Sequence, residues 1–205
     1  MKINLNRGLA ICSIGSLLVF GALPFAEAAE RDSAFEIGLG LVSTPEQNDV
    51  IERTYSDYSM SGGGSMLNVE LGYSIALGHA ISIVPKFNYI AYVAEFVNSN
   101  FPGASSSRSN TFFLSGMALR FNVDAGGGHF FVSGYAGNNS ASSDFSRINA
   151  LRENGNVTGF SVGYVFKSFQ LEVGTMKIPV IIETDSVPSS EADFGGTFFT
   201  LKRVF

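Results

Sequence analysis

The sequence predicts an all-β fold, an eight-stranded antiparallel up-and-down transmembrane β-barrel. From Phe35 to Phe205, short stretches in which every second residue is apolar alternate with breaks rich in Gly, Ser or Asn. Strict alternation gives a strand one apolar face and one polar face. The breaks are alternately short and long, which a membrane barrel explains and a soluble sandwich does not. The chain also begins with a segment typical of exported proteins.

Residues 1–28 are predicted to be a cleaved signal peptide. A basic start is followed by an apolar run over residues 8–23, and Ala26-Glu27-Ala28 has the small-x-small pattern of a cleavage site. The apolar run of about 16 residues is shorter than the roughly 20 that a membrane-spanning helix needs. Residues 29–205 are then the mature protein, which is predicted to form a single domain, the outer-membrane β-barrel.

The charge balance argues against nucleic acid as a partner. The chain has 13 Lys and Arg against 18 Asp and Glu, a formal net charge of −5, and its basic residues form no cluster. Its one cysteine, Cys12, lies in the predicted signal peptide, so we expect no thiol or disulfide chemistry. No later stretch is apolar for long enough to form a transmembrane helix, and an exported membrane protein of this kind has to be a barrel.

Eight segments carry the strand pattern. They are 34–44, 65–77, 81–94, 110–123, 130–138, 157–166, 169–182 and 194–205. Three connections are short, namely 78–80, 124–129 and 167–168, and four are long and polar, namely 45–64, 95–109, 139–156 and 183–193. Short turns at one end and long loops at the other are the plan of outer-membrane barrels, which places both chain termini in the periplasm.

The register of the hairpins supports these strands. A two-residue loop at 167–168 puts three apolar pairs on one face, as pairing across a ladder requires. These pairs are Phe166 with Phe169, Tyr164 with Leu171, and Val162 with Val173. The hairpin at 78–80 likewise places Leu71 opposite Phe87.

Two positions in the predicted strands are less regular. Pro85 cannot donate to a ladder, so we expect a β-bulge there. Phe130 and Phe131 are adjacent, and either could face lipid, so the lipid-facing register of strand 130–138 stays open.

With the apolar residues facing outward, the inward positions carry mostly Gly, Ser, Asn and charged side chains. Glu70, Lys86, Arg120 and Glu172 belong to this inward set. A soluble core could not be built from such residues, whereas the lumen of a membrane barrel is polar. Glu70 and Lys86 are diagonal neighbours in the predicted register. Because an unpaired buried charge costs several kcal/mol, we expect the four to form a lumen charge network.

At the end of the chain, Phe199, Leu201 and the terminal Phe205 lie at alternating positions, although Arg203 interrupts the apolar series. With this ending, the chain resembles the small eight-stranded outer-membrane barrels of Gram-negative bacteria, of the OmpA-like, OmpX and OmpW types, over about residues 30–205. The resemblance implies that the three residues are an assembly signal read by the barrel-assembly machinery. It also implies location in the cell outer membrane and contact with outer-membrane lipid and lipopolysaccharide.

Catalysis has weak support in the sequence. Some barrels of similar size deacylate or palmitoylate lipid A, which remains a minor alternative here. Such enzymes need a nucleophile, with histidine as the obvious base, near the outer leaflet. His79 and His129 are the only histidines, and both fall at predicted periplasmic turns. We therefore predict no catalytic residue, no metal site and no cofactor.

The long loops are the remaining place for function, because binding residues concentrate on exposed connections held by a rigid scaffold. Tyr55, Tyr58, Phe96 and Phe101 are the recognition candidates there, although aromatic residues suit a membrane-interface girdle equally well. We expect a non-enzymatic envelope-structural or surface-recognition protein that uses four extracellular loops, with a possible extracellular ligand. The alternative is a narrow porin-like channel or carrier for small solutes, although an eight-stranded interior is only wide enough for side chains to fill.

Overall fold

The computed structural model describes residues 33–43, 58–61, 65–98, 105–143, 148–153, 155–184 and 190–205. The predicted signal peptide lies outside the described residues. Within these segments, no helix has the length and apolar character needed to cross a membrane.

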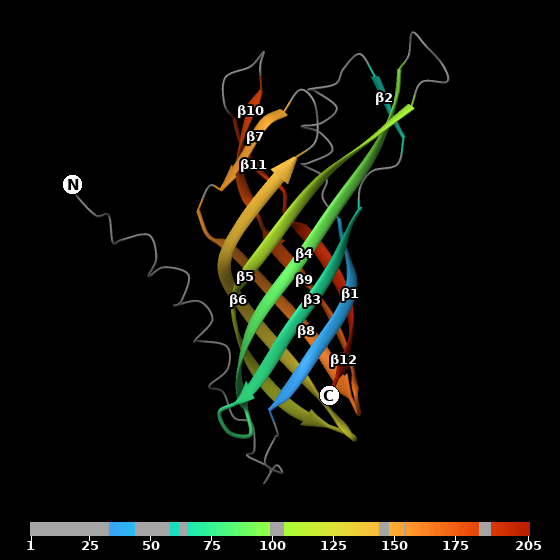
Figure 1. Ribbon diagram of the computed structural model, residues 1–205. Coiled ribbons are helices and arrows are strands. Elements are labelled where there is room, and N and C mark those ends of the chain that lie inside the picture. The colour runs from blue at the N-terminus through green and yellow to red at the C-terminus, as the bar shows by residue number, and fades with distance from the viewer. Residues whose placement is uncertain are drawn as a thin grey trace, which may run out of the picture.

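Eight antiparallel strands close into a barrel, which confirms the predicted fold class (Figure 1). Each strand pairs with the next barrel strand along the chain, and pairing of the first with the last closes the ring. The barrel strands are β1 Ala34–Ser43, β3 Ser65–Ala76, β4 Ile81–Asn98, β5 Ser105–Ala125, β6 Gly128–Ser143, β8 Val157–Phe166, β9 Phe169–Lys177 and β12 Gly196–Val204.

Tight turns join the strands at the end of the barrel where the chain terminates (Figure 1). The β8–β9 turn has two residues, with Lys167 at φ 51°, and all three apolar pairs predicted for this hairpin are present. Gly126 and Gly127, at φ 52° and 91°, form an equally short turn between β5 and β6. Positive φ at both central residues matches the twist of the flanking strands, which is why glycine suits this turn. The predicted 124–129 connection was therefore too long, because Asp124 pairs with His129 and Ala125 with Gly128, which leaves two residues in the turn.

The β3–β4 hairpin has the expected register without the expected bulge. Leu71 pairs with Phe87 as predicted, and Ile75 pairs with Ile83 further down in the same register. The ladder to β3 is interrupted beside Pro85, which has no N–H to donate. On its other side Pro85 pairs with Met117 of β5. The bulge prediction was wrong because a missing donor interrupts the bonding without adding a residue.

Strands β4, β5 and β6 are longer than predicted and rise above the rest of the barrel at the end opposite the tight turns (Figure 1). The β4–β5 ladder continues from Val93 paired with Ser109 to Val97 paired with Ser105. The serine-rich sequence there lacks apolar alternation, so it was predicted as loop. Backbone hydrogen bonding requires no such alternation once a hairpin is established.

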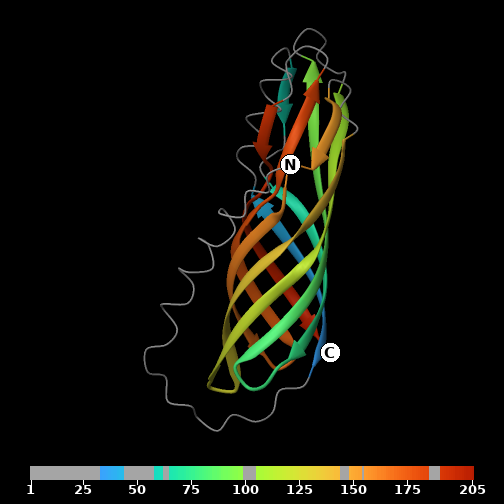
Figure 2. The ribbon, with the colours of Figure 1, turned by 90° about the vertical axis from the view of Figure 1, so that its left-hand side faces the viewer.

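Four more strands lie at this loop end; three fall in predicted loops, and most of β10 falls in the predicted strand 169–182. They are β2 Tyr58–Ser61, β7 Ile148–Glu153, β10 Pro179–Thr184 and β11 Ser190–Asp193. β2 pairs with β4, whereas β10 lies between β7 and β11 in a separate three-stranded sheet. Figure 2 shows these elements together above the barrel.

The predicted strand 169–182 was wrong, because it divides at Ile178 into β9 and β10. The Asp193 carboxylate accepts hydrogen bonds from the backbone N–H groups of Ile178 (2.8 Å) and Gly195 (2.9 Å). The N–H of Phe194 donates to the carbonyl of Ile178 over 2.9 Å. Pro179, the next residue, has no N–H for the barrel ladder. The chain therefore leaves the barrel sheet at this point and enters the separate sheet.

The barrel wall presents apolar side chains outward around its circumference. Phe87 is 62% exposed and Leu201 48% exposed. On β6, Phe130 faces outward at 57% exposure and Phe131 inward at 2%, which settles the register that the sequence left open. The outward apolar surface extends to the tight-turn end, where Phe166, Phe169 and Phe205 are also exposed.

Candidate functional site

Six charged side chains meet inside the tight-turn half of the barrel. Three are acidic and three basic, each comes from a different strand, and each is at most 5% exposed. We call this set the lumen charge cluster: Glu36, Glu70, Lys86, Arg120, Glu172 and Lys202. Its formal charge is zero if all six are ionised.

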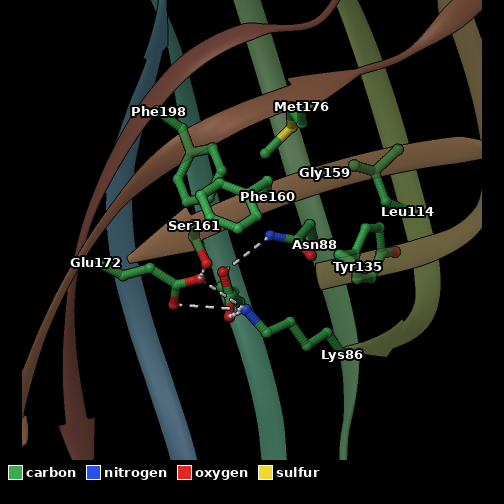
Figure 3. A pocket seen from close by; sticks show the side chains of 11 residues that line it. Lys86, Asn88, Leu114, Tyr135, Gly159, Phe160, Ser161, Glu172, Met176 and Phe198 are labelled. Atoms are coloured by element: carbon green, nitrogen blue, oxygen red, sulfur yellow. Dashed lines mark hydrogen bonds and ion pairs between the residues drawn. The ribbon is translucent and has the colours of Figure 1, made fainter. Parts of the chain in front are cut away.

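Two lysines link the three carboxylates of the cluster. The Lys86 ammonium lies 3.0 Å from Glu70 and 3.1 Å from Glu172 (Figure 3). The Lys202 ammonium lies 2.5 Å from Glu172 and 3.5 Å from Glu36, and it also pairs with Glu70. Each lysine therefore bridges Glu70 and Glu172, and Lys202 joins this pair to Glu36.

Arg120 completes the cluster through a two-pronged contact. Its two terminal nitrogens donate to the two oxygens of Glu36 over 2.7 and 3.1 Å. The guanidinium carbon also lies 4.4 Å from the centroid of the Phe131 ring. A planar guanidinium suits both contacts, because it matches a carboxylate fork and stacks on an aromatic face.

Uncharged side chains complete the hydrogen bonding of the carboxylates. Ser161 donates to Glu172 over 2.6 Å, and Gln170 donates to its other oxygen over 3.0 Å. Asn88 donates to Glu70 over 3.3 Å. Buried charges lose their hydration, and paired charges with further hydrogen bonds offset that cost. This arrangement therefore supports a rigid, filled interior.

The four inward charges predicted from the sequence all lie in this cluster, and the diagonal neighbours Glu70 and Lys86 form an ion pair. Sequence reasoning missed Glu36 and Lys202. Both were detectable, because each occupies the inward phase of a strand whose neighbouring odd-numbered positions face outward.

The loop half of the barrel interior is mostly apolar, which corrects the expectation of a polar lumen, although Asn110 and Asn139 are also buried there. Buried side chains of the barrel strands pack there with residues from β10, β11 and the segments beside them. We call this set the apolar plug: Val42, Met66, Ile90, Tyr92, Phe112, Leu114, Val157, Met176, Ile178, Val180, Ile182, Ala192, Phe194 and Phe198. We call β7, β10 and β11 the cap; it closes the loop end of the barrel interior.

A cavity of about 20 Å³ lies between the charge cluster and the plug (Figure 3). Leu114, Met176 and Phe198 line it on the plug side, and Lys86 and Glu172 on the charged side. A cavity needs about 10–15 Å³ to hold one water molecule, so this one has room for about one.

The assembly-signal candidates lie on the outer wall at the tight-turn end. Phe199, Leu201 and Phe205 are all about half exposed or more. The Phe205 N–H donates to the Phe35 carbonyl over 2.9 Å, and their ring centroids are 6.4 Å apart. Arg203, which breaks the apolar series, lies with its guanidinium carbon 4.9 Å from the centroid of the Phe169 ring.

The structure separates the other candidates from the cluster. Tyr58 begins β2, and Phe96 pairs with Met60 where β2 meets β4. Tyr55 and Phe101 lie outside the described residues. His79 and His129 are at the tight-turn end, in the β3–β4 turn and near the start of β6.

Among the described residues, no group of three or more His, Cys, Asp or Glu side chains is arranged to hold a metal ion.

The barrel resembles a solved structure. The crystal structure of the outer membrane protein OprG from Pseudomonas aeruginosa aligns with 87% of this chain and 98% of its own, with a TM-score of 0.55. This chain has the fold of a small outer-membrane β-barrel. Sequence identity is 9%, so the likeness concerns the fold alone. No protein-family model and no curated protein sequence matches the chain.

Proposed function

We propose that this chain is a non-enzymatic protein of the bacterial outer membrane, with a structural or surface-recognition role carried by its loop end. The fold shared with OprG and the outward apolar wall support this location. In water, exposed apolar side chains such as Phe87 and Leu201 would be hydrated at a cost in free energy, whereas in a membrane lipid would cover them.

The filled interior is the observation that carries the non-transport role. The charge cluster obstructs one half of the lumen, and the apolar plug obstructs the other. The cavity between them has room for about one water molecule. A barrel filled in this way suits a rigid support for its loop end better than a path for solutes.

Planar bilayer conductance tests this proposal against the channel alternative. The refolded full chain should leave the membrane silent, while a pore-forming barrel inserted under the same conditions shows openings. Steady single-channel openings from this chain would contradict the filled-lumen argument and favour the narrow channel.

The positions of the histidines support a non-enzymatic role. Both lie at the tight-turn end, whereas a lipid A-modifying site has to reach the outer leaflet near the loop end. Lipid A from cells that express the protein should keep its mass. Loss or gain of an acyl chain would overturn the non-enzymatic assignment.

Cysteine labelling tests the location and orientation. Because the one cysteine lies in the predicted signal peptide, single cysteines can be introduced at Glu191, exposed at the loop end, and at Ala80, exposed in the β3–β4 turn. A membrane-impermeant maleimide should label E191C on intact cells and leave A80C unlabelled until the cells are opened. The reverse pattern would invert the barrel, and equal labelling of both would exclude a membrane barrier between them.

A further inference from the structure

We propose that the cap is a hinged lid, which opens at the loop end and uncovers the apolar plug while the charge cluster keeps the other half of the barrel closed. The structure shows the lid in its closed position. This inference goes beyond the proposed function, because it gives the loop end two states. Three features support it, namely the joins between cap and barrel, the contacts that hold the cap shut, and the buried amide groups beside it.

The cap is joined to the barrel along one line. Each cap strand continues a barrel strand: β7 leads into β8, β10 follows β9, and β11 leads into β12 (Figure 2). The strands β8, β9 and β12 are adjacent in the barrel, and β7, β10 and β11 are adjacent in the same order in the cap. The three joins are therefore neighbours. A small sheet joined in this way can rotate as one body about a few residues at the ends of its strands.

The side edges of the cap are not held by the barrel sheet. Within the described strands, neither β7 nor β11 forms a ladder with a barrel strand, and the ladder between β6 and β8 stops where β8 begins. The register also changes at the joins, because Thr158 pairs with Lys177 below them and Glu153 with Val180 above them. The β7–β8 side thus has two additional residues, in a stretch that contains Gly155 at φ 91°. These residues bend β7 away from the ladder to β6.

Apolar contacts hold the lid shut. Val180 and Ile182 of β10 and Ala192 of β11 are buried in the plug. The ring of Phe194 meets the ring of Phe112 on β5 edge to face, with centroids 5.8 Å apart. Opening exposes these side chains to water, so the closed state is the more populated one.

Two polar contacts act along the line of the joins. The Asp193 carboxylate accepts the N–H groups of Ile178 and Gly195, which stand where β10 and β11 meet the barrel. The Asn139 side chain on β6 donates to the carbonyl of Pro179, at the start of β10, over 3.2 Å. The carboxylate makes the stronger hydrogen bonds, because it is charged. Asp193 is therefore the main polar latch of the closed lid.

Buried amide groups work against the closed state. Asn110 on β5 is fully buried and pairs with Tyr92 of the plug. In the described part of the chain, neither end of the Asn110 amide has a hydrogen-bond partner, and the oxygen of Asn139 has none either. A polar group that is buried without a partner carries the full cost of its lost hydration, whereas water satisfies it when the site opens. Opening the lid relieves this cost, which offsets part of the exposure of the plug.

Opening of the lid leaves the tight-turn half of the interior closed. All six members of the charge cluster come from barrel strands, so the cluster does not move with the cap. The open form is a cup at the loop end with a charged, filled floor. The lid thus changes which surface the protein presents outside the cell without creating a path through the barrel.

Cysteine reactivity measures the opening. In a full chain that carries Cys12→Ser, A192C places the single thiol in the plug, and E191C places it one residue away on the exposed face of β11. A118C places it at a fully buried position two residues from Arg120 of the charge cluster. Each chain is refolded in detergent and checked for the compact barrel by gel mobility. The rate of modification by N-ethylmaleimide is then measured.

We expect E191C to react fastest and A192C about a hundredfold more slowly, as for a lid that is open about 1% of the time. A118C should react at least about tenfold more slowly than A192C, because only unfolding of the barrel exposes it. A192C as slow as A118C would overturn the proposal, since the cap would then open only when the barrel unfolds. A192C as fast as E191C would overturn it as well, since the cap would not be closed.

Two variants of the A192C chain test the latch and the buried amide. D193A should raise the rate about tenfold, a change of about 1.4 kcal/mol, without changing A118C. E191A is its matched control, because it removes an exposed carboxylate on the other side of the cysteine. N110L should lower the rate about tenfold, because leucine has a similar shape and no amide to hydrate. Its control is N138L, at an exposed position of β6.

Equal acceleration of A192C and A118C by D193A would overturn the lid, because it would assign Asp193 to the stability of the whole barrel. An N110L chain that reacts as fast as its parent would overturn it too. D193A should remain silent in a planar bilayer, as the wild type should. Openings from D193A alone would contradict the closed floor of the cup.

Discussion

Removing the Lys202 ammonium should lower the free energy of unfolding of the barrel more than removing an exposed charge does. Lys202 lies within 3.5 Å of three carboxylates and is 1% exposed. In Lys202→Met the side chain keeps its length, but the cluster carries three acids against two bases and one buried negative charge in excess. Breaking a buried pair by deleting one partner costs about 3–5 kcal/mol. We expect the free energy of unfolding to fall by about that amount.

The measurement is a urea titration of barrel refolded into lipid vesicles, followed by far-ultraviolet circular dichroism because the chain has no tryptophan. Arg203→Met is the matched control, since Arg203 is the next residue and is exposed on the outer wall. Its guanidinium lies near the rings of Phe169 and Phe205. Its loss should cost about 1 kcal/mol or less. A second change, Glu70→Gln, restores charge balance and should recover part of the loss in K202M.

Two results would refute this reasoning. One is a K202M variant as stable as R203M, which would mean that the ammonium contributes nothing beyond its alkyl stem. The other is a double variant less stable than K202M by the full cost of E70Q, because independent effects add whereas members of one network do not.

Three further predictions concern other parts of the wall and cap. A Cβ on Gly163 would meet both the Phe131 ring and the backbone carbonyl oxygen of Leu171 closer than any normal contact, so G163A should lower the free energy of unfolding by about 1–3 kcal/mol. The added change F131L relieves the ring contact but not the backbone one, so it should restore part of the loss in the same urea titration. Gly127 has φ 91°, so G127V should cost about 1–2 kcal/mol and slow refolding followed by gel mobility, whereas an unchanged variant would contradict the turn assignment. Asp193→Ala removes the acceptor of two backbone N–H groups, so hydrogen exchange at the Ile178 amide should accelerate while exchange in β8 stays unchanged, and equal protection in both proteins would show that the carboxylate is dispensable.

The barrel could be predicted because its information is local. Alternation along each strand gives the two faces, and a two-residue turn such as Lys167-Ser168 then determines which residues pair. The register of Tyr164 with Leu171 follows from neighbouring residues alone. The same reasoning placed Glu70 beside Lys86, because a tight hairpin joins their strands.

The centre of the interior could not be predicted in full, because it depends on contacts across the barrel. Arg120 and Glu36 are 84 residues apart and meet only when β1 and β5 curve around the same lumen. Hairpin register says nothing about that distance. The pairing depends on how far the strands shift against one another when the sheet closes.

The apolar plug was missed for a different reason. At the loop end both faces of β5 are apolar, since Phe112 and Leu114 point inward while Phe113 points outward. Alternation disappears when lipid covers one face and protein the other. A continuous apolar run within an otherwise alternating strand is the available indication that the lumen is closed at that height.

The cap strands impose opposite demands on neighbouring positions. Val180, Ile182 and Ala192 are buried in the plug, whereas Glu191 is exposed and Ile181 is half-buried between the two buried positions of β10. Natural variants can therefore differ at every second residue of β10 and β11 while the intervening residues stay small or aliphatic. In a saturation-mutagenesis library, the exposed positions of β10 and β11 should tolerate many substitutions and the buried positions few. This alternation would limit how far the sequence of these strands can change before the loop end of the barrel interior is no longer filled.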